Sequence, residues 1–307
     1  MSIIVKDLTK VFGEQTAVDH VNFSVNQGEI MGFLGPNGAG KSTTMKIASC
    51  YLTPTSGTVE ISGYDVLTHS MEVRKRVGYL PENNPLYTDM YVKEYLGLIA
   101  RIHKVNNVNR RVGEMIEFTG LGLEQGKKIG QLSKGYRQRV GLAQTMIHDP
   151  EVLIMDEPTS GLDPNQIVEI RQLIRNISSK KTVVLSTHIM QEVQAMCDRV
   201  VIINRGKIVS DSSIRDLVTS GTGQKMIRIE FSGPVNPGLF EKLPGVEKLE
   251  TQDGNIIRIT FDRDVDARTE IFRIAAEHNL PVVGLTQEEI SIENIFRDLT
   301  NTPDEKK

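Results

Sequence analysis

The stretch Gly35-Pro-Asn-Gly-Ala-Gly-Lys-Ser-Thr43 joins two segments of different character. Before it, residues 29–34 (Glu-Ile-Met-Gly-Phe-Leu) are almost entirely apolar and predict a buried strand. From Lys41 onward the apolar residues fall at helical spacing, so the stretch forms a strand-to-helix turn. In this context the pattern G-x-x-x-x-G-K-[ST] predicts a loop whose backbone N–H groups cradle phosphate.

The same loop assigns chemistry to individual side chains. Lys41 is expected to place its charge at the β- and γ-phosphates of a nucleotide, and the Ser42 hydroxyl is expected to bind Mg²⁺. The helix N-terminus adds partial positive charge. We therefore expect the whole loop to bind nucleotide: Gly35, Pro36, Asn37, Gly38, Ala39, Gly40, Lys41, Ser42 and Thr43. A glycine-rich turn with a surface lysine is the alternative, and the strand–loop–helix context argues against it.

A second apolar run, residues 151–155, ends at Asp156 and Glu157. Its composition predicts a buried parallel strand. Ligands gather at the carboxyl ends of the strands in such a sheet, so both acids are expected to face the phosphate loop. Asp156 would hold the hydration shell of Mg²⁺, and Glu157 would orient or deprotonate the attacking water. Two acids after a strand can also cap a helix, but the preceding phosphate loop favours the catalytic interpretation.

Composition excludes several classes of protein. The chain has 307 residues, with 36 Lys and Arg against 39 Asp and Glu, and this balance argues against nucleic-acid binding. The two cysteines, Cys50 and Cys197, are far apart in sequence and are expected to be buried reduced thiols. We find no signal-peptide pattern, and no apolar run approaches the ~18–20 residues that span a bilayer. A role at a membrane would therefore depend on a partner.

Secondary-structure patterns divide the chain in two. Alternating strand and helix signals predict an α/β domain with a mostly parallel sheet over residues 1–218, including a helical region at about 86–147. A small polar linker at 220–224 follows. Residues 222–307 then carry a β-α-β-β-α-β pattern, which predicts a small α+β ferredoxin-like domain. Its helices are expected at 238–242 and 267–278, with a last helix at Ile292–Leu299.

Three further segments resemble one family. Leu132-Ser-Lys-Gly-Tyr-Arg-Gln-Arg139 resembles the signature of ABC ATPases, usually written LSGGQ-x-QR. Asp156-Glu-Pro-Thr-Ser-Gly-Leu-Asp-Pro164 is similar to their Walker B motif and D-loop, and Ser186-Thr-His188 resembles the switch-histidine segment. The resemblance covers about residues 2–215. It implies a P-loop NTPase fold and an ATP-binding subunit of an ABC transporter.

The resemblance also implies roles for residues outside the phosphate loop. In the family two such domains stack head to tail, so the signature residues of one protomer would meet the γ-phosphate held by the other; here these are Ser133, Lys134 and Gly135. His188 would contact the γ-phosphate, and Asp163 would communicate across the dimer. Phe12 matches the aromatic residue that stacks on adenine, although a lone aromatic can equally belong to the core.

Two departures from the family pattern narrow the resemblance. Glu82 stands where the family has the Q-loop glutamine, keeping an oxygen for Mg²⁺ while adding a negative charge. Lys134 and Tyr136 replace a glycine and the glutamine of the signature. With both replacements, the signature resembles that of the ABC-2 export branch of the family. Within that branch, residues 32–43 (GFLGPNGAGKST), residues 77–96 (VGYLPENNPLYTDMYVKEYL) and the ferredoxin-like tail resemble the gliding-motility-associated ABC ATPases of Bacteroidetes. This resemblance would link the partner to surface motility or adhesin secretion.

The resemblance implies an ATP-hydrolysing motor that uses ATP and Mg²⁺ and works with ABC-2-type transmembrane permease subunits. It would act as a homodimer or beside a second ATPase subunit, without nucleic acid, on the cytoplasmic face of the membrane. The region near Tyr87–Tyr95 is expected to face the partner. An importer ATPase, a soluble ABC protein and a non-hydrolysing nucleotide sensor are the alternatives. The sensor is disfavoured because Glu157 and His188 are both present.

Overall fold

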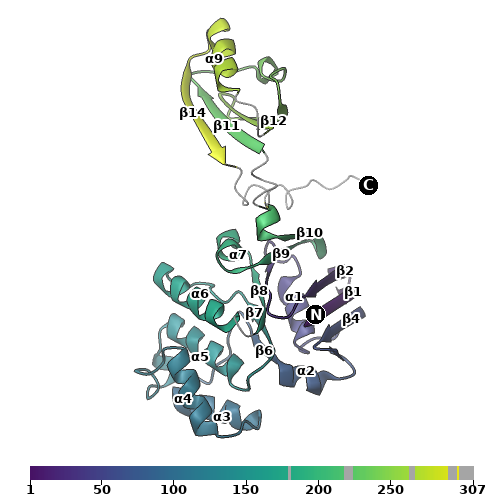
Figure 1. Ribbon diagram of the computed structural model, residues 1–307, viewed down its shortest axis with the longest axis vertical. Coiled ribbons are helices and arrows are strands. Elements are labelled where there is room, and N and C mark those ends of the chain that lie inside the picture. The colour runs from purple at the N-terminus through teal and green to yellow at the C-terminus, as the bar shows by residue number, and fades with distance from the viewer. Residues whose placement is uncertain (179–180, 218–223, 263–266, 290–295, 297–307) are drawn as a thin grey trace. The chain divides into compact units, whose positions relative to one another are not determined.

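The computed structural model describes residues 1–178, 181–217, 224–262, 267–289 and 296. The chain forms two compact units, Met1–Ser213 and Ile214–Lys307, each taken here by itself (Figure 1). This division falls a few residues before the one expected from the sequence at 218–222. The expected linker lies mostly outside the described residues, and so does the expected helix Ile292–Leu299, of which only Phe296 is described.

A six-stranded sheet in the order β10-β9-β3-β8-β7-β6 forms the centre of the first unit. The five strands from β9 to β6 are parallel, as the sequence predicts, and β10 is antiparallel at the edge. Every residue of β3 and β7 is buried, which explains their nearly continuous apolar runs. The bounds are β3 Ile30–Leu34, β6 Val77–Leu80, β7 Val152–Asp156, β8 Thr182–Thr187, β9 Arg199–Asn204 and β10 Lys207–Ser213.

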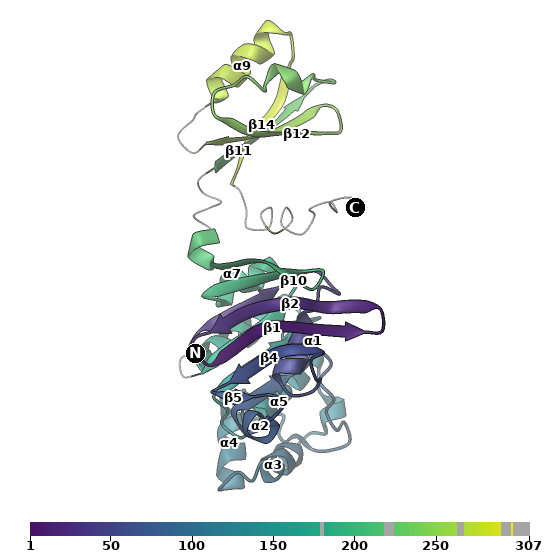
Figure 2. The ribbon, with the colours of Figure 1, turned by 90° about the vertical axis from the view of Figure 1, so that its right-hand side faces the viewer.

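A four-stranded antiparallel sheet in the order β2-β1-β4-β5 lies beside the central sheet, as Figure 2 shows. Its strands are β1 Ile3–Phe12, β2 Gln15–Val25, β4 Ser56–Ile61 and β5 Tyr64–Asp65. Helix α1 (Lys41–Ala48) contacts β2 and β4 of this sheet and β7 and β8 of the central one. The apolar core between the sheets includes Phe23 and Phe33, whose ring centroids are 5.3 Å apart. The helix that follows the phosphate loop is therefore fixed from two sides.

Helices cover the rest of the first unit. The helical region predicted at 86–147 contains α3, α4 and α5, which lie together at one end of the unit in Figure 1, and the one-turn 3₁₀ helix η1. Helices α6 and α7 contact each other, and α7 packs on β3 and β8. The bounds are α2 Ser70–Arg76, α3 Val92–Ile102, α4 Val108–Phe118, η1 Ile129–Gln131, α5 Lys134–Met146, α6 Pro164–Ser178 and α7 Met190–Met196.

The second unit contains an antiparallel sheet in the order β12-β13-β11-β14. This is the ferredoxin-like arrangement predicted from the sequence, but the first helix expected at 238–242 is reduced to the 3₁₀ turn η2. Pro237, Gly238 and Pro244 lie in or next to this short segment and disfavour a regular helix. The bounds are β11 Gln224–Phe231, η2 Pro237–Leu239, β12 Val246–Gln252, β13 Ile256–Asp262, α9 Arg268–Glu277 and β14 Val282–Glu289.

Candidate active site

The candidate site lies at the carboxyl ends of three adjacent parallel strands, β3, β8 and β7. Leu34 pairs with Thr187, and Asp156 pairs with Ser186. The phosphate loop, His188 and Glu157 therefore leave the sheet at the same edge. A pocket of about 620 Å³ opens there, and it contains most of the residues expected to bind nucleotide. Its lining residues are Phe12, Gln15, Ala17, Asn37, Gly38, Gly40, Lys41, Ser42, Thr43, Glu82, Glu157, Ser160 and His188.

Two glycines of the phosphate loop are required by its geometry. Gly40, the residue before α1, has φ +107°, and a Cβ there would collide with the carbonyl oxygen of Ala17. A Cβ on Gly35 would collide with the carbonyl oxygen of Ile203. The loop is thus packed closely between its neighbours, with α1 beginning at Lys41 directly under the pocket.

Lys41 is buried, with 5% of its surface exposed. Its Nζ donates to the carbonyl oxygens of Gly35 (2.7 Å) and Pro36 (3.1 Å) and lies 3.6 Å from Glu157 Oε1. Burial lowers the pKa of this ammonium, and the nearby Glu157 carboxylate opposes that shift. The lysine is therefore held by the loop backbone at the floor of the pocket, where phosphate oxygens can replace its carbonyl partners.

Asp156 and Ser42 supply oxygen atoms suited to Mg²⁺. Ser42 Oγ donates to Asp156 Oδ1 at 3.0 Å, although the two residues are 114 positions apart in sequence. Asp156 is almost fully buried, and Ser186 Oγ also donates to its Oδ1. A hydroxyl and a carboxylate are hard donors, and Mg²⁺ is usually held by one or two such groups together with substrate phosphates. In the described part of the chain there is no cluster of three or more His, Cys, Asp or Glu side chains able to hold a metal by itself.

Glu157 lies between Lys41 and His188. Its Oε1 faces Lys41 Nζ, and its Oε2 is 3.0 Å from His188 Nδ1. Its backbone has φ +48°, a left-handed conformation that costs a residue with a side chain on the order of 1–2 kcal/mol. Its N–H compensates by donating to Ser186, at 3.1 Å to the carbonyl oxygen. The left-handed turn aims the carboxylate into the pocket instead of along the chain.

Phe12 and Glu82 both line the pocket, although Phe12 precedes the phosphate loop in the sequence and Glu82 follows it. Phe12, at the end of β1, is 47% exposed, so the alternative that it belongs to the core is wrong. Lys10 Nζ lies 4.9 Å from the centre of its ring. Glu82 follows β6 and lines the same pocket. Both side chains therefore border the same pocket as Lys41.

The signature residues lie elsewhere in the chain. Ser133 is the N-cap of α5, and its Oγ accepts from the N–H of Tyr136 at 3.3 Å. Gly135 is buried beneath Gln166, whose Cδ would lie 2.6 Å from an added Cβ. Lys134 lies over Gly161. None of the three signature residues lines the pocket with Lys41, so within one chain the structure does not bring them to the phosphate loop.

Asp163 has a structural role in its own chain. Its Oδ1 accepts from the N–H of Gln166 at 2.9 Å, which caps the first turn of α6. Pro164 occupies the first position of that helix, where a missing N–H costs nothing. The residue expected to communicate across a dimer thus also starts a helix.

Known proteins are similar to this chain. The sequence profile of the family described as ABC transporter matches residues 18–160. The bacitracin transport ATP-binding protein BcrA of Bacillus licheniformis is 35% identical over 301 residues, covering 96% of this chain and 97% of that protein. The chain belongs to the ATP-binding subunits of ABC transporters. The Nod factor export ATP-binding protein I of Ralstonia nicotianae is 33% identical and covers 96% of this chain, with 92% of its own length matched.

Solved structures of ABC cassettes agree with this assignment. A dimeric cassette, MJ0796, in a post-hydrolysis state with ADP and phosphate, superposes with a TM-score of 0.64 at 26% identity. It covers 69% of this chain and 99% of that one. The structure of an ATP-binding subunit of an ABC transporter gives a TM-score of 0.66 at 29% identity and covers 72% of this chain and 93% of its own length.

Several polar residues that hold the segment around Asp156 and Glu157 were not identified from the sequence. Ser186 holds both Asp156 and the backbone of Glu157. Gln138, within the signature segment, donates from Nε2 to the carbonyl oxygen of Pro158 at 2.8 Å and so links α5 to the residue after Glu157. The sequence could have pointed to Gln138, because it lies within the signature segment, and to Ser186, because it lies two residues before His188.

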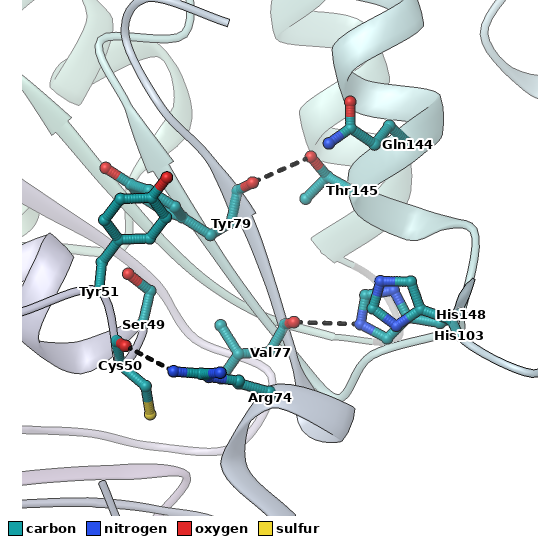
Figure 3. Close-up of a pocket in the computed structure, with 10 residues that line it drawn as sticks. All are labelled: Ser49, Cys50, Tyr51, Arg74, Val77, Tyr79, His103, Gln144, Thr145 and His148. Atoms are coloured by element: carbon teal, nitrogen blue, oxygen red, sulfur yellow. Dashed lines mark hydrogen bonds between the residues drawn. The ribbon is translucent and has the colours of Figure 1, made fainter. Parts of the chain in front are cut away.

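A second pocket of about 530 Å³ lies between the core of the ABC domain and its helical region, as Figure 3 shows. Tyr51, Val77 and Tyr79 contribute from the core. His103 and His148, from the helical region, stack with ring centroids 4.0 Å apart. The cysteines differ from expectation here, because Cys50 lines this pocket and is only half-buried, whereas Cys197 is buried; both are free thiols.

Proposed function

We propose that this chain is an ATP-hydrolysing motor subunit of an ABC exporter. The observation that carries the proposal is the Glu157 carboxylate, held between Lys41 and His188 above a phosphate loop in one pocket. ATP binds with its phosphates in the loop. Glu157 orients the attacking water and accepts its proton at a carboxylate oxygen, while His188 hydrogen-bonds Glu157 and faces the terminal phosphate.

Magnesium fits the oxygen donors at the base of the pocket. Ser42 and Asp156 would hold the ion, with Glu82 as a further carboxylate on the pocket wall. Bound Mg²⁺ neutralises charge on the phosphate oxygens. The ammonium group of Lys41 adds a positive charge beside the phosphates. Phe12 has an exposed ring at the edge of the pocket, on which adenine can stack.

We further propose that two such chains, or one chain and a second ATPase subunit, form the working unit. The support is the position of Ser133, Lys134 and Gly135 away from their own chain's pocket, together with the dimeric cassettes among similar structures. The exposed start of α5 is the positive end of a helix dipole, which favours an anion. A γ-phosphate held by a second chain supplies that anion.

The transmembrane partner is proposed to dock at the second pocket. Tyr51 is 73% exposed at its edge, and Tyr87 is 59% exposed in the segment after β6. An adjoining pocket shares Tyr51, Tyr79 and Gln144 with it and also contains Glu82, Ser42 and Asp156. A partner segment placed there would therefore adjoin residues of the ATP site. Tyr95, in contrast, is buried and donates to Gln144 at 2.5 Å, so it is not part of this exposed surface.

Export is favoured by the names of the full-length relatives, which refer to bacitracin transport and Nod factor export. No described helix is long and apolar enough to cross a membrane. We propose a cytoplasmic location on the inner membrane face through the permease. The narrower resemblance to gliding-motility ATPases stays a prediction, which the permease that co-purifies with the chain would test.

Replacing Glu157 tests the proposed hydrolysis. Glu157→Gln should slow ATP hydrolysis on the order of 10²–10⁴-fold while ATP binding persists, because an amide cannot accept the proton from water. The variant should also accumulate an ATP-bound dimer in size exclusion. Glu151→Gln, at the exposed opposite end of β7, is the matched control and should hydrolyse normally. Normal turnover by Glu157→Gln would remove Glu157 from the role of base.

A further inference from the structure

A fully buried glutamate lies behind the site in helix α7. Glu192 has no exposed surface, four residues after His188. One of its carboxylate oxygens accepts a hydrogen bond from Thr159 Oγ1, and the other accepts from Thr187 Oγ1 at 2.8 Å. Thr187 Oγ1 accepts in turn from the N–H of Ile189 at 3.1 Å. The carboxyl group therefore joins two chain segments that are 28 residues apart.

Both segments carry a residue of the proposed reaction. Thr159 lies two residues after Glu157, and Thr187 lies immediately before His188. The side chain of His188 is 44% exposed, so packing alone does not fix it. Glu157 has the left-handed backbone noted above, a conformation that persists only where surrounding contacts determine it. The distance of 3.0 Å between His188 Nδ1 and Glu157 Oε2 thus depends on how their two loops are held together.

A carboxyl group buried in this way is expensive unless its oxygens are satisfied. The ion pairs found among the described residues include none to Glu192, and its hydrogen-bond partners there are the two threonine hydroxyls. A core position that only needed volume would be filled at lower cost by an apolar side chain. An apolar residue of the same size would lack the two carboxylate oxygens, each of which binds one of the two loops.

We infer that Glu192 is a positioning residue for ATP hydrolysis, acting through Thr159 and Thr187 to hold Glu157 and His188 in register. The inference rests on the proposed roles of Glu157 and His188. Small displacements of reacting groups carry large penalties, about 10²-fold for 1 Å. Glu192→Ala should therefore lower kcat by roughly 10–100-fold, while the Kd for ATP, set by the phosphate loop, should change less than about twofold.

A purely structural role would reduce stability without this pattern, so the test combines three readouts. Single-turnover hydrolysis, ATP affinity and unfolding are measured on the full chain for Glu192→Ala, Glu192→Gln and Thr187→Val. Glu192→Gln should recover part of the rate, because its amide keeps one acceptor oxygen and can donate to the other hydroxyl. Thr119→Val is the control, since the hydroxyl of this buried threonine donates to the carbonyl oxygen of Met115 in α4 at 2.7 Å, away from Glu192, and the rate of this variant should be unchanged.

A double-mutant cycle with His188→Ala separates the explanations. If Glu192 acts through the His188 segment, adding Glu192→Ala to His188→Ala should lower the rate by less than about threefold. Multiplicative effects, or a folded Glu192→Ala with a normal kcat, would overturn the inference. If Glu192→Ala does not fold, Thr187→Val carries the test, and a normal kcat for it has the same meaning. Full activity in both Glu157→Gln and His188→Ala would instead refute the proposed function.

Discussion

Acid is expected to destabilise the first unit through His148. Its Nε2 donates to the carbonyl oxygen of Val77 at 3.0 Å, and its ring stacks on His103 at an interplanar angle of 12°. Its Nδ1 is buried without a hydrogen-bond partner among the described residues. Burial, together with the neighbouring His103, Lys181 and Arg111, lowers the pKa of His148 from 6.5 to about 4, and the hydrogen bond to Val77 partly opposes this shift. The folded state therefore keeps this imidazole neutral.

The size of the effect follows from the shift. Between pH 6.5 and pH 4 the unfolded chain binds a proton at His148 that the folded chain does not, so the stabilisation present above pH 6.5 is lost as the pH falls. One pKa unit corresponds to 1.36 kcal/mol, which gives a loss of about 3 kcal/mol. For a unit of this size, such a loss lowers Tm by roughly 6–12 °C.

The assay compares wild type with His148→Gln, whose amide can still donate to Val77 but does not titrate. Denaturant unfolding at pH 7 and pH 4 should show a wild-type loss about 3 kcal/mol larger than that of the variant. The exposed His69, replaced in the same way, is the control and should leave the wild-type loss intact. Equal losses in wild type and His148→Gln would refute the reasoning.

Three further predictions concern binding. Lys41→Ala should weaken ATP affinity at least tenfold, measured by calorimetry, whereas the exposed Lys93→Ala should not; unchanged affinity would count against the phosphate loop. Gly40→Ala should lower the free energy of unfolding by more than about 1 kcal/mol, because its φ is +107° and its Cβ meets Ala17, while Gly113→Ala in α4 should be neutral or slightly stabilising. Tyr51→Glu should reduce co-purification of the permease while ATP hydrolysis by the isolated chain persists; intact co-purification places the docking surface elsewhere.

The sequence predicted the parts of the site that depend on local spacing. The glycine loop and the acid pair can each be recognised within a few residues of sequence, because one lies between a strand and a helix and the other follows a buried strand. Adjacent parallel strands then bring the two motifs to the same edge of the sheet. The mostly parallel sheet and the ferredoxin-like unit were predicted from the same kinds of pattern, whereas the number and order of the strands come from the structure. Short elements such as α2 and β6 were not predicted, because four to seven residues carry too little periodicity.

Contacts between segments that are distant in the sequence could not be predicted from it. Nothing in the spacing of Glu192 distinguishes it from an exposed helical glutamate, and only the fold buries it between Thr159 and Thr187. Tyr95 illustrates the same limit: it was expected on a partner-facing region, but Gln144, 49 residues later, binds its hydroxyl inside. Burial raises its pKa to about 12. Propensity cannot report such pairings, since they arise from tertiary packing.

The central claim, an ATP site completed by the signature of a second chain, is tested most directly by mixing two defective variants. Lys41→Ala lacks the phosphate contact, and Ser133→Asp keeps a helix N-cap but sets a negative charge where the γ-phosphate would lie. In their mixed dimer one site pairs an intact Lys41 with an intact Ser133. Single-turnover hydrolysis, lost in each variant alone, should return to about a quarter of the wild-type amplitude in an equal mixture, if the chains pair at random in a symmetric dimer. No recovery in a mixture shown to contain mixed dimers would contradict the account.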